Sequence, residues 1–297
     1  MISMVLTNRN NLPLPLVEAV RNDPYDRGDC DFSVTELILP PRIGELRRQH
    51  RGEITEDASD RIFALLGQAI HTILERVAGE RYLVEKRFTI YHKNSGVKVS
   101  GRIDCFDQQT RTLADYKLTS RYATKDGIKP EWECQGNLNR LLMEKNETKV
   151  DKIEFWAIYR DWSKMAVSRG VKEMPLEQVQ AFEIPMWDLA ETEAYLDERI
   201  QLHQEAAETL PLCTDEERWY KPAKWAVMKK GREKAIRGGL CASEEAAAEM
   251  IAGFDDPKQY RIEYRKGEHQ RCMHYCDVAP FCSFFKELLE QEHNEQR

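Results

Sequence analysis

The chain has 297 residues, of which 41% are hydrophobic and 32% are charged. This is the composition of a globular protein, which excludes a wholly disordered chain and allows a sizeable core in one large or two smaller domains. The formal net charge is −7, so no global basic field attracts nucleic acid, and a site for a polyanion must come from a local arrangement of charge.

From its hydropathy, we expect the sequence to contain neither a membrane-spanning segment nor a signal peptide. No stretch approaches about 18 consecutive apolar residues, the length that a membrane-spanning helix needs. The first residues lack the basic start and apolar block of a signal peptide. We therefore expect a cytoplasmic protein with no membrane partner, whose eight cysteines stay reduced.

The first third of the chain predicts an arm followed by helices. Pro and Asn interrupt residues 1–32, which indicates an irregular N-terminal arm. Ser33 and Glu36 have the spacing of a capped helical turn. Residues 58–78 have apolar side chains at helical spacing, which predicts an amphipathic helix with His71 beside its apolar stripe.

The middle of the chain predicts an α/β core over residues 33–210. Alternating apolar residues and turn signals predict an antiparallel meander of three strands, followed by helices and further strands. The meander strands are 82–92, 97–107 and 111–118; helices are expected over 131–145 and 187–209, and strands over 150–160 and 179–186. The order helix, three strands, helix, strand is typical of an α/β fold.

The composition changes after Pro211. A basic and aromatic segment comes first, then a short predicted helix over 244–252, a cysteine cluster and a helical tail. We expect residues 211–297 to form a C-terminal lobe that packs on the core.

The most informative segment joins an aspartate near the end of one predicted strand, Asp104, to Asp115 and Lys117 on the next. Because side chains alternate along a strand, Asp115 and Lys117 point to the same face, and strand pairing can place Asp104 beside Asp115. Two carboxylates and a main-chain carbonyl form an oxygen site that suits Mg²⁺ or Mn²⁺. Charged residues on the wet face of an edge hairpin would give the same spacing.

Three more polar residues accompany this segment in a definite order. His71 ends the sequence Gly67 to His71 on the helix before the meander, Glu85 lies on the first predicted strand, and Gln135 lies on the helix after it. Together with the G-x-I-D sequence that ends at Asp104 and the D-x-K sequence from Asp115, this order resembles the RecB-like branch of the PD-(D/E)XK nuclease superfamily. That branch includes CRISPR-associated and phage-encoded exonucleases, and the resemblance runs from about Ser33 to Cys282.

The resemblance implies a restriction-endonuclease-like core, in which helices flank a mixed central sheet. It also implies the residues of the active site. The metal ligands would be His71, Asp104, Asp115 and the carbonyl of Tyr116; Lys117 would be the catalytic lysine, with Glu85 and Gln135 also in the catalytic site. Gln135 would help to place the substrate strand. Asn139 stands where the family's trailing helix usually has a tyrosine.

A cysteine cluster near the C-terminus has the spacing C-x3-C-x5-C, formed by Cys272, Cys276 and Cys282. Thiolates this close suit a soft metal ion or an iron–sulfur cluster. Relatives that hold a cluster usually take one ligand from an upstream Cys-Pro-Arg triplet, which reads Pro-Pro-Arg over residues 40–42 here.

The fourth ligand must therefore come from elsewhere. Cys213 is our first choice, because it begins the segment that a cluster would hold, and Cys30 is the second. His274 is an alternative if the metal is Zn²⁺. We expect a [4Fe–4S] cluster in preference to zinc, with a structural role, while buried cysteines without a metal are the alternative.

Residues 219–237 combine many cations with Trp219, Tyr220 and Trp225. The predicted nucleic-acid contacts are Lys224, Lys229, Lys230, Arg232, Lys234 and Arg237. Cations that track phosphates and rings that stack on bases suit a single-stranded or frayed nucleic acid. A solvated helix face with core aromatics is the alternative. The arginines of residues 42–51 would form a second basic wall.

The leading hypothesis is a divalent-metal-dependent DNA exonuclease of recombination, repair or phage DNA metabolism. It would act on single-stranded DNA or duplex ends, in the host cytoplasm if phage-encoded. A recombination or single-strand-binding protein would be its protein partner. One alternative is a catalytically silent nuclease fold that binds DNA or a protein, against which the intact Asp104, Asp115 and Lys117 argue. The other is a restriction-type endonuclease, which would need a recognition domain that 297 residues leave little room for.

Overall fold

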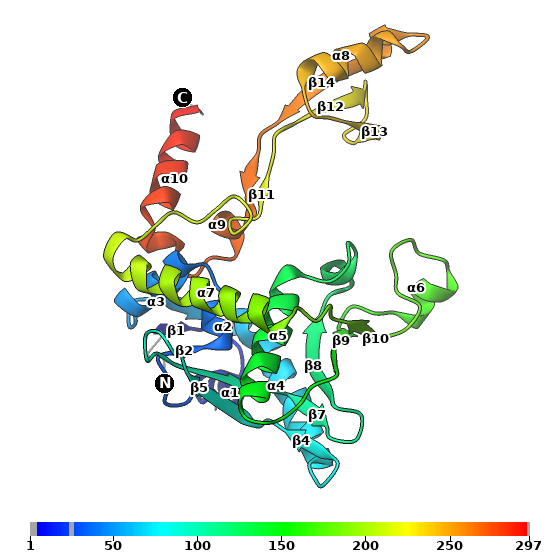
Figure 1. The fold of residues 1–297 in the computed structure, drawn as a ribbon. Helices are drawn as coiled ribbons and strands as arrows, with labels where there is room; N and C mark the ends of the chain where they lie inside the picture. The colour runs from blue at the N-terminus through cyan, green and yellow to red at the C-terminus, as the bar shows by residue number, and fades with distance from the viewer. Residues whose placement is uncertain (1–4, 24–26, 296–297) are drawn as a thin grey trace. The chain divides into compact units, whose positions relative to one another are not determined.

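The computed structural model describes residues 5–23 and 27–295. The chain divides into two units, Met1–Leu210 and Pro211–Arg297, and the second begins at the residue where the sequence indicated a new lobe. Both units combine helices with small sheets, so the protein is a mixed α/β protein (Figure 1). Within the described residues, no helix has the length and apolarity needed to cross a membrane.

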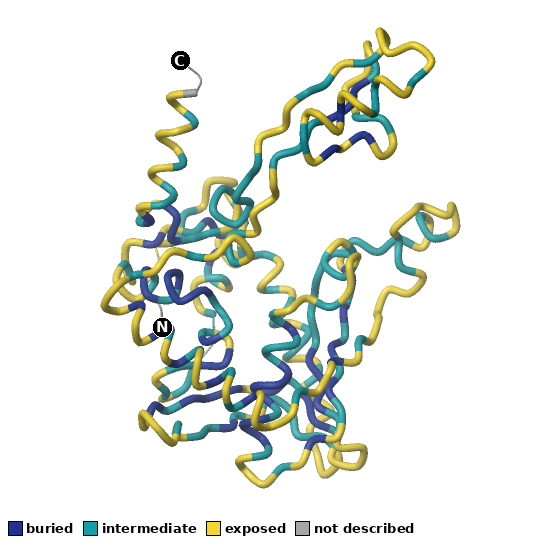
Figure 2. Tube along the Cα trace, turned by 45° about the horizontal axis from the view of Figure 1, so that its top comes forward, coloured by how far each residue is buried: buried dark blue, intermediate teal, exposed yellow. Residues whose placement is uncertain are grey.

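The main sheet of the first unit has five strands in the order β10-β9-β8-β7-β4. Its strands are β4 (Tyr82–Val84), β7 (Cys105–Asp107), β8 (Thr112–Thr119), β9 (Lys152–Tyr159) and β10 (Val179–Glu183). Strand β8 pairs antiparallel with β7 and parallel with β9. Burial alternates along β9, where Ile153, Phe155, Ala157 and Tyr159 are buried, as the period of two along a strand requires. Figure 2 shows such buried stretches between exposed loops.

Two smaller sheets complete the first unit. One contains β2 (Phe32–Ser33), β6 (Lys98–Arg102) and β5 (Arg87–Tyr91), and the other pairs β1 (Val5–Thr7) with β3 (Thr55–Asp57).

The predicted three-stranded meander is wrong in one respect. The expected strand 82–92 is divided into β4 and β5, and the expected strand 97–107 into β6 and β7. The first half of one strand and the second half of the other pair in the main sheet, whereas the remaining halves pair in the smaller one. The first of these strands breaks at Glu85, whose φ is 50°.

Local sequence signals explain where several helices of the first unit begin. They are α1 (Leu14–Arg21), α2 (Val34–Leu37), α3 (Pro41–Gln49), α4 (Ile62–Leu74), α5 (Pro130–Lys145), α6 (Lys164–Ser168) and α7 (Leu189–Thr209), with 3-10 turns η1 (Ala58–Arg61), η2 (Glu75–Val77) and η3 (Arg121–Thr124). Ser33 and Glu36 form the expected capping box of α2. Helix α5 starts at a proline, has Glu131 and Glu133 in its first turn, and contains no β-branched residue.

The N-terminal segment is more ordered than the sequence indicated. Residues 1–4 and 24–26 lie outside the described residues, but the rest of the expected arm contains β1 and α1. Asp57 explains the order, because its buried carboxylate accepts hydrogen bonds from the Thr7 hydroxyl at 2.7 Å and the Arg9 N–H at 2.8 Å. The irregular arm over 1–32 is thus contradicted.

Helix α4 carries His71 and contacts β8. It has helical apolar spacing as expected, yet no residue of α4 is fully buried. Phe63, Leu66 and Ile73 are 52%, 47% and 54% exposed. The apolar face of this helix is therefore not part of the core of the first unit. That core lies between α5, α7 and the sheets, around residues such as Leu138, Leu142 and Phe155.

The second unit contains two small sheets and three helices. Its strands are β11 (Tyr220–Lys221), β12 (Lys224–Lys229), β13 (Ala235–Cys241), β14 (Tyr260–Arg265) and β15 (Glu268–His269), and its helices are α8 (Glu244–Ala252), α9 (Gln270–His274) and α10 (Ser283–Glu295), with 3-10 turns η4 (Pro257–Gln259) and η5 (Ala279–Phe281). Helix α8 packs on the sheet β13-β12-β14 and forms a small core with Val227, Cys241 and Ala247.

Candidate metal centre

Three side chains from separate elements of the first unit converge beside β8. His71 comes from α4, Glu85 from the link between β4 and β5, and Asp104 from the link between β6 and β7. One ligand atom from each residue lies within 4.8 Å of the other two. His71 Nδ1 is 3.0 Å from Glu85 Oε1 and 3.6 Å from Asp104 Oδ1.

The backbone brings these residues together at the point where both predicted strands break. The Glu85 N–H donates to the Asp104 carbonyl at 3.1 Å, and the Ile103 N–H donates to the Lys86 carbonyl at 3.0 Å. The Asp104 side chain in turn accepts a hydrogen bond from the Tyr116 N–H at 2.8 Å. The two carboxylates are therefore held next to each other and next to β8 by main-chain hydrogen bonds.

A second group lies on β8 itself. Lys117 Nζ is 2.6 Å from Asp115 Oδ1 and donates a hydrogen bond to Gln135 Oε1 at 3.1 Å. The Gln135 amide donates to Asp115 Oδ2 at 2.9 Å. As strand alternation requires, Asp115 and Lys117 face the same way, toward α5. The pairing of Cys105 with Ala114 places Asp104 opposite Asp115, as the sequence predicted.

The charges in the two groups affect one another. Burial, followed by the nearby Asp115 carboxylate, raises the pKa of Asp104 to about 7. The hydrogen bond that the His71 ring donates to the Glu85 carboxylate raises the pKa of His71, against the opposite effect of burial. Burial acts to lower the pKa of Lys117, but the carboxylates of Asp115 and Asp104 outweigh it and raise that pKa overall. The carboxylates thus disfavour one another's negative charge and favour a positive charge placed among them.

The structure brings together six of the side chains that the sequence singled out: His71, Glu85, Asp104, Asp115, Lys117 and Gln135. Tyr116 contributes its backbone N–H to Asp104. The sequence analysis missed Arg102, whose Nε lies 3.0 Å from Glu85 Oε2. Its position inside the G-x-I-D sequence is the signal that could have pointed to it.

Asn139, which stands in place of the family's tyrosine, is 4% exposed. A Cβ at Gly101 would lie 2.3 Å from Asn139 Oδ1 and 3.1 and 3.2 Å from atoms of Val34 and Leu142. Gly101 is therefore required by close packing against α5, and Asn139 occupies a packing position rather than the metal centre.

The donor set fits a hard divalent cation. A histidine nitrogen and carboxylate oxygens are ligands that Mn²⁺ and Mg²⁺ accept. His71, Glu85 and Asp104 are already within one coordination shell of each other. Glu85 joins this shell, whereas the sequence placed it only among the catalytic residues. Asp115 is held by Lys117 and Gln135, and its charge acts on both Asp104 and His71.

The predicted ligands of the cysteine cluster lie together in the second unit. Burial, the Glu217 carboxylate and then the thiols of Cys272, Cys276 and Cys282 raise the pKa of Cys213 to about 12. The four thiols are thus near enough to interact electrostatically. His274 instead places Nε2 2.8 Å from Glu268 Oε1. Cys30 belongs to the first unit, where its thiol donates to the Arg27 carbonyl at 3.4 Å.

The spacing of these thiols is wider than zinc requires. A tetrahedral zinc ion with bonds of about 2.3 Å holds its sulfurs about 3.8 Å apart. Among the described cysteines and histidines of the second unit, no three ligand atoms lie within 4.8 Å of one another. These thiols are therefore not gathered at the spacing of zinc ligands.

The predicted basic wall on α3 is not formed as expected. Arg42 is 5% exposed, and its guanidinium donates to the Leu210 carbonyl at 2.5 Å. Arg48 donates to the Glu45 carboxylate at 2.8 Å. Two of the arginines in residues 42–51 thus serve packing and ion pairing within the first unit.

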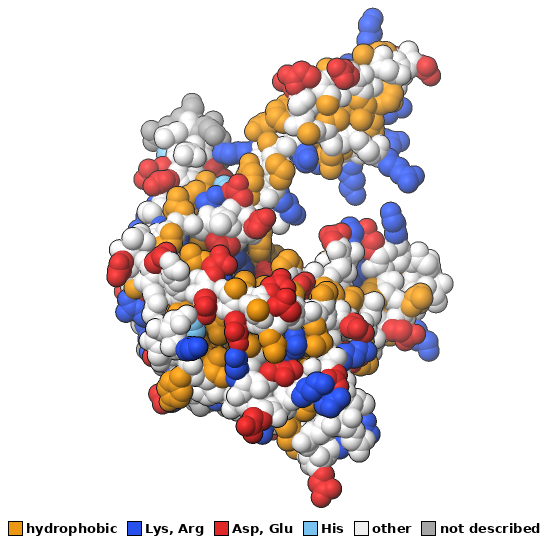
Figure 3. Space-filling view, in the orientation of Figure 1, with side chains coloured by type: hydrophobic (Ala, Val, Ile, Leu, Met, Phe, Trp, Pro, Cys, Tyr) orange, Lys and Arg blue, Asp and Glu red, His pale blue; other side chains and the backbone are white. Residues whose placement is uncertain are grey.

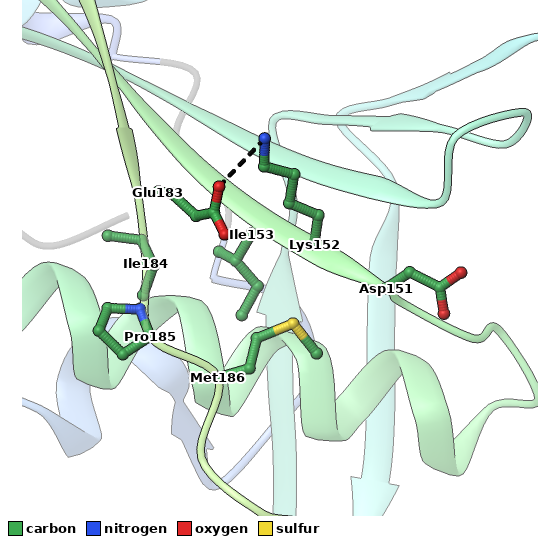
Figure 4. A pocket seen from close by; sticks show the side chains of 7 residues that line it. All are labelled: Asp151, Lys152, Ile153, Glu183, Ile184, Pro185 and Met186. Carbon is green, nitrogen blue, oxygen red and sulfur yellow. Dashed lines mark ion pairs between the residues drawn. The ribbon is translucent and has the colours of Figure 1, made fainter.

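A pocket of about 390 Å³ lies away from this centre, where β9 begins and β10 ends (Figure 4). Lys152 at this pocket pairs with Glu183 at 3.2 Å. Its lining residues are Asp151, Lys152, Ile153, Glu183, Ile184, Pro185 and Met186. None of them is a residue that the sequence singled out.

Comparisons with known proteins found distant similarity to solved structures. No protein-family model matches the sequence, and no curated protein matches it. The solved structure titled "Crystal structure of SSO0001" is similar to this chain with a TM-score of 0.46 and 19% sequence identity, over 63% of this chain and 84% of that one. The function of the centre is therefore inferred from its own residues.

Proposed function

We propose that the protein is a divalent-metal-dependent DNA nuclease with a restriction-endonuclease-like core of the RecB-like type. The convergence of His71, Glu85 and Asp104 within 4.8 Å, beside the Asp115–Lys117 pair at 2.6 Å, carries the proposal. The alternative, charged residues on the solvent-exposed face of an edge hairpin, does not explain why side chains from α4, two strand breaks and β8 converge. An exonuclease that acts at strand ends is the form we favour.

The roles of the residues follow from their contacts. His71, Glu85 and Asp104 would hold Mg²⁺ or Mn²⁺ together with Asp115. When bound, such an ion stabilises charge on a phosphoryl oxygen and favours deprotonation of an attacking water. Lys117 stays protonated between two carboxylates, so its ammonium can orient the water or stabilise negative charge in the transition state.

Gln135 positions the catalytic pair. Its amide accepts from Lys117 and donates to Asp115, so it fixes the rotamers of both side chains. Because both ends of the amide are used, Gln135 holds a single orientation. We assign it this positioning role, in addition to the placing of the substrate strand that the family resemblance implies.

We also propose that Cys213, Cys272, Cys276 and Cys282 hold a [4Fe–4S] cluster with a structural role in the second unit. The C-x3-C-x5-C spacing of three of them and their electrostatic effects on Cys213 support a shared metal group. An absorbance spectrum and metal analysis of anaerobically purified protein test it. A broad band near about 400 nm with iron and sulfide is expected, and a colourless protein that contains zinc would contradict it.

A cleavage assay tests the nuclease activity. The protein is incubated with end-labelled single-stranded DNA, end-labelled duplex DNA and a closed circular plasmid, with Mn²⁺, Mg²⁺ or EDTA. We expect metal-dependent shortening of the linear substrates, an intact circle, and a loss of about 100-fold or more for Asp115→Asn. Glu80→Gln, at an exposed position, is the matched control and should behave as the wild type.

Each other outcome of this assay contradicts part of the proposal. Cleavage of the circle into discrete fragments would indicate a restriction-type endonuclease. Binding of DNA without metal-dependent cleavage by the wild type would indicate a catalytically silent module. Equal activity of Asp115→Asn and the wild type would place the chemistry at another site.

A further inference from the structure

The sheet β13-β12-β14 and helix α8 form a module in the second unit whose charges are segregated. The strands and turn of residues 224–241 and 260–265 contain eight basic and two acidic residues, whereas residues 242–259, which include α8, contain five acidic residues and one lysine. In Figure 3 most acidic side chains of this module lie along the edge where α8 is drawn, and Lys and Arg side chains project from the opposite edge.

The basic side of the module is mainly the hairpin of β12 and β13, which we call the basic hairpin (residues 224–241). Its turn has the sequence Lys230 to Lys234, with Gly231 at a φ of 77°, a conformation that glycine adopts at no steric cost. Its six cations are Lys224, Lys229, Lys230, Arg232, Lys234 and Arg237.

These cations have no partner in the part of the chain that the structure describes. Among the described residues, none of the six side chains forms an ion pair or a hydrogen bond, whereas Arg261 and Arg265 on the neighbouring β14 pair with Glu263 at 2.9 and 3.3 Å. Six unpaired positive charges on one hairpin repel each other, and the protein as a whole has a net charge of −7. The hairpin is thus electrostatically complementary to a polyanion that lies outside the chain.

The aromatic residues of the predicted nucleic-acid segment precede the basic hairpin or stand at its start, away from its turn. The ring centroids of Trp219 and Tyr275 are 5.5 Å apart, and those of Tyr220 and His269 are 4.5 Å apart. Trp225 packs against Tyr264 at 5.1 Å and against the small core under α8. Residues 226–241 contain no aromatic side chain. Single-strand binding relies on bases stacking on rings, so the turn and the strand residues beside it lack the main feature of a single-strand site.

We propose that the basic hairpin is a duplex-binding arm that contacts the phosphate backbone of double-stranded nucleic acid, through the cations of its turn and without reading the bases. A two-stranded ribbon fits the major groove of B-form DNA, and backbone contacts by Lys and Arg suffice for sequence-independent affinity. This inference rests on the proposed nuclease function for its choice of ligand. It replaces the expected single-stranded ligand of this segment with duplex.

Binding measurements on the full chain test the arm separately from catalysis. Fluorescence anisotropy in EDTA compares a labelled 20-base-pair blunt duplex with a single strand of the same length, at salt concentrations from 50 to 200 mM. The variant Lys230→Gln/Arg232→Gln/Lys234→Gln removes the three cations of the turn. Its matched control, Lys93→Gln/Lys149→Gln/Lys172→Gln, removes three exposed cations of the first unit and leaves the hairpin intact.

We expect the wild type to bind the duplex more tightly than the single strand. The turn variant should lose about 10-fold or more in duplex affinity at 100 mM salt, and the slope of log affinity against log salt should fall by about 2 to 3. The control variant should change both quantities much less. The variants' far-ultraviolet circular dichroism should match that of the wild type, because the turn is exposed.

Three results would overturn the inference: equal losses for the turn variant and its control, equal affinity for single strand and duplex, or equally tight binding of poly-glutamate. The nuclease proposal has its own readout, because cleavage of a short single strand does not need the arm. Hairpin-dependent duplex binding without cleavage would leave the arm standing and refute the nuclease. Cleavage without hairpin-dependent binding would support the nuclease and refute the duplex-binding arm.

Discussion

The backbone N–H of Glu85 donates a hydrogen bond to the carbonyl of Asp104 at 3.1 Å. This bond lies where two long extended segments cross from one sheet to another, and each segment carries an acidic side chain at that point. The crossing directs both carboxylates toward His71. The break in the strands is thus the feature that builds the metal centre.

The backbone of Glu85 is strained at its position in the candidate metal centre, because its φ is 50°. A non-glycine residue in this region costs about 1 kcal/mol or more. We predict that Glu85→Gly is more stable than Glu85→Ala by about 1 kcal/mol, measured by thermal unfolding. Both variants lack the carboxylate, so both should lose Mn²⁺ affinity to the same extent. Equal stability of the two variants would show that the backbone at this position is relaxed.

Under the proposed function, Lys117 acts on the reaction and not on the metal. We predict that Lys117→Met lowers the single-turnover rate of DNA cleavage by about 100-fold or more, while Mn²⁺ binding persists, because its ammonium is not a metal ligand. Lys93→Met, at an exposed position, provides the control. A variant that loses Mn²⁺ binding and cleavage in parallel would assign Lys117 a role in assembling the centre instead.

Gly101 packs too closely against α5 to accept a side chain. We predict that Gly101→Ala lowers the free energy of unfolding by about 1–3 kcal/mol, because the new methyl group would meet Asn139, Val34 and Leu142. The double variant Gly101→Ala/Asn139→Ala frees the nearest of these contacts and should recover part of the loss relative to Asn139→Ala alone. Strictly additive effects would mean that the two positions do not meet.

His203 makes the first unit sensitive to acid. It is 6% exposed on α7, with Nε2 3.2 Å from the Leu37 carbonyl, which fits a neutral ring that donates there. Burial and then the Arg199 charge lower its pKa, against weaker opposite effects of the Leu37 and Leu39 carbonyls and of Glu36. Because the unfolded state takes up this proton first, stability falls as the pH drops below about 6.5.

Thermal unfolding at pH 7.5 and 5.5 checks this effect. The His203→Gln variant keeps a donor for Leu37 but cannot take up the proton, so its unfolding midpoint should fall less between the two pH values than that of the wild type. His293→Gln, at an exposed position, should retain the wild-type difference. An unchanged difference in His203→Gln would exclude His203 as the source.

Elements with strong local signals could be predicted from the sequence almost to the residue. Helix α5 begins at Pro130, one residue before the expected start, and α8 spans residues 244–252 as expected. The alternation of residues 152–159 identified β9. In each case the signal is contained in the segment itself, as a helix-starting proline or a period of two.

The division of the meander could not be predicted, because it depends on partners distant in sequence. The extended pattern continues through Glu85 without a glycine or proline to mark the break. The aromatic residues of the second unit show the same limit: Trp225 stands next to Lys224 in sequence, yet its ring packs in the core under α8. Adjacent residues on a strand point to opposite faces, so sequence proximity does not give a shared surface.

The site residues could be chosen, but their grouping depended on the fold. The order of His71, Asp104, Asp115, Lys117 and Gln135 in the sequence pointed to one centre. Glu85 was included without a contact to support it, and the structure places it 3.0 Å from His71. Arg102 was overlooked because it ends β6, whereas its partner Glu85 lies on the link between β4 and β5, distant in sequence.

The central claim is that one divalent ion binds among His71, Glu85 and Asp104. Titration of the full chain with Mn²⁺, with free Mn²⁺ counted by electron paramagnetic resonance, tests it most directly. The wild type should bind Mn²⁺, and His71→Ala and Asp104→Asn should each weaken binding by about 10-fold or more, while Glu80→Gln binds as the wild type does. Mn²⁺ affinity that is the same in all four proteins would contradict the claim.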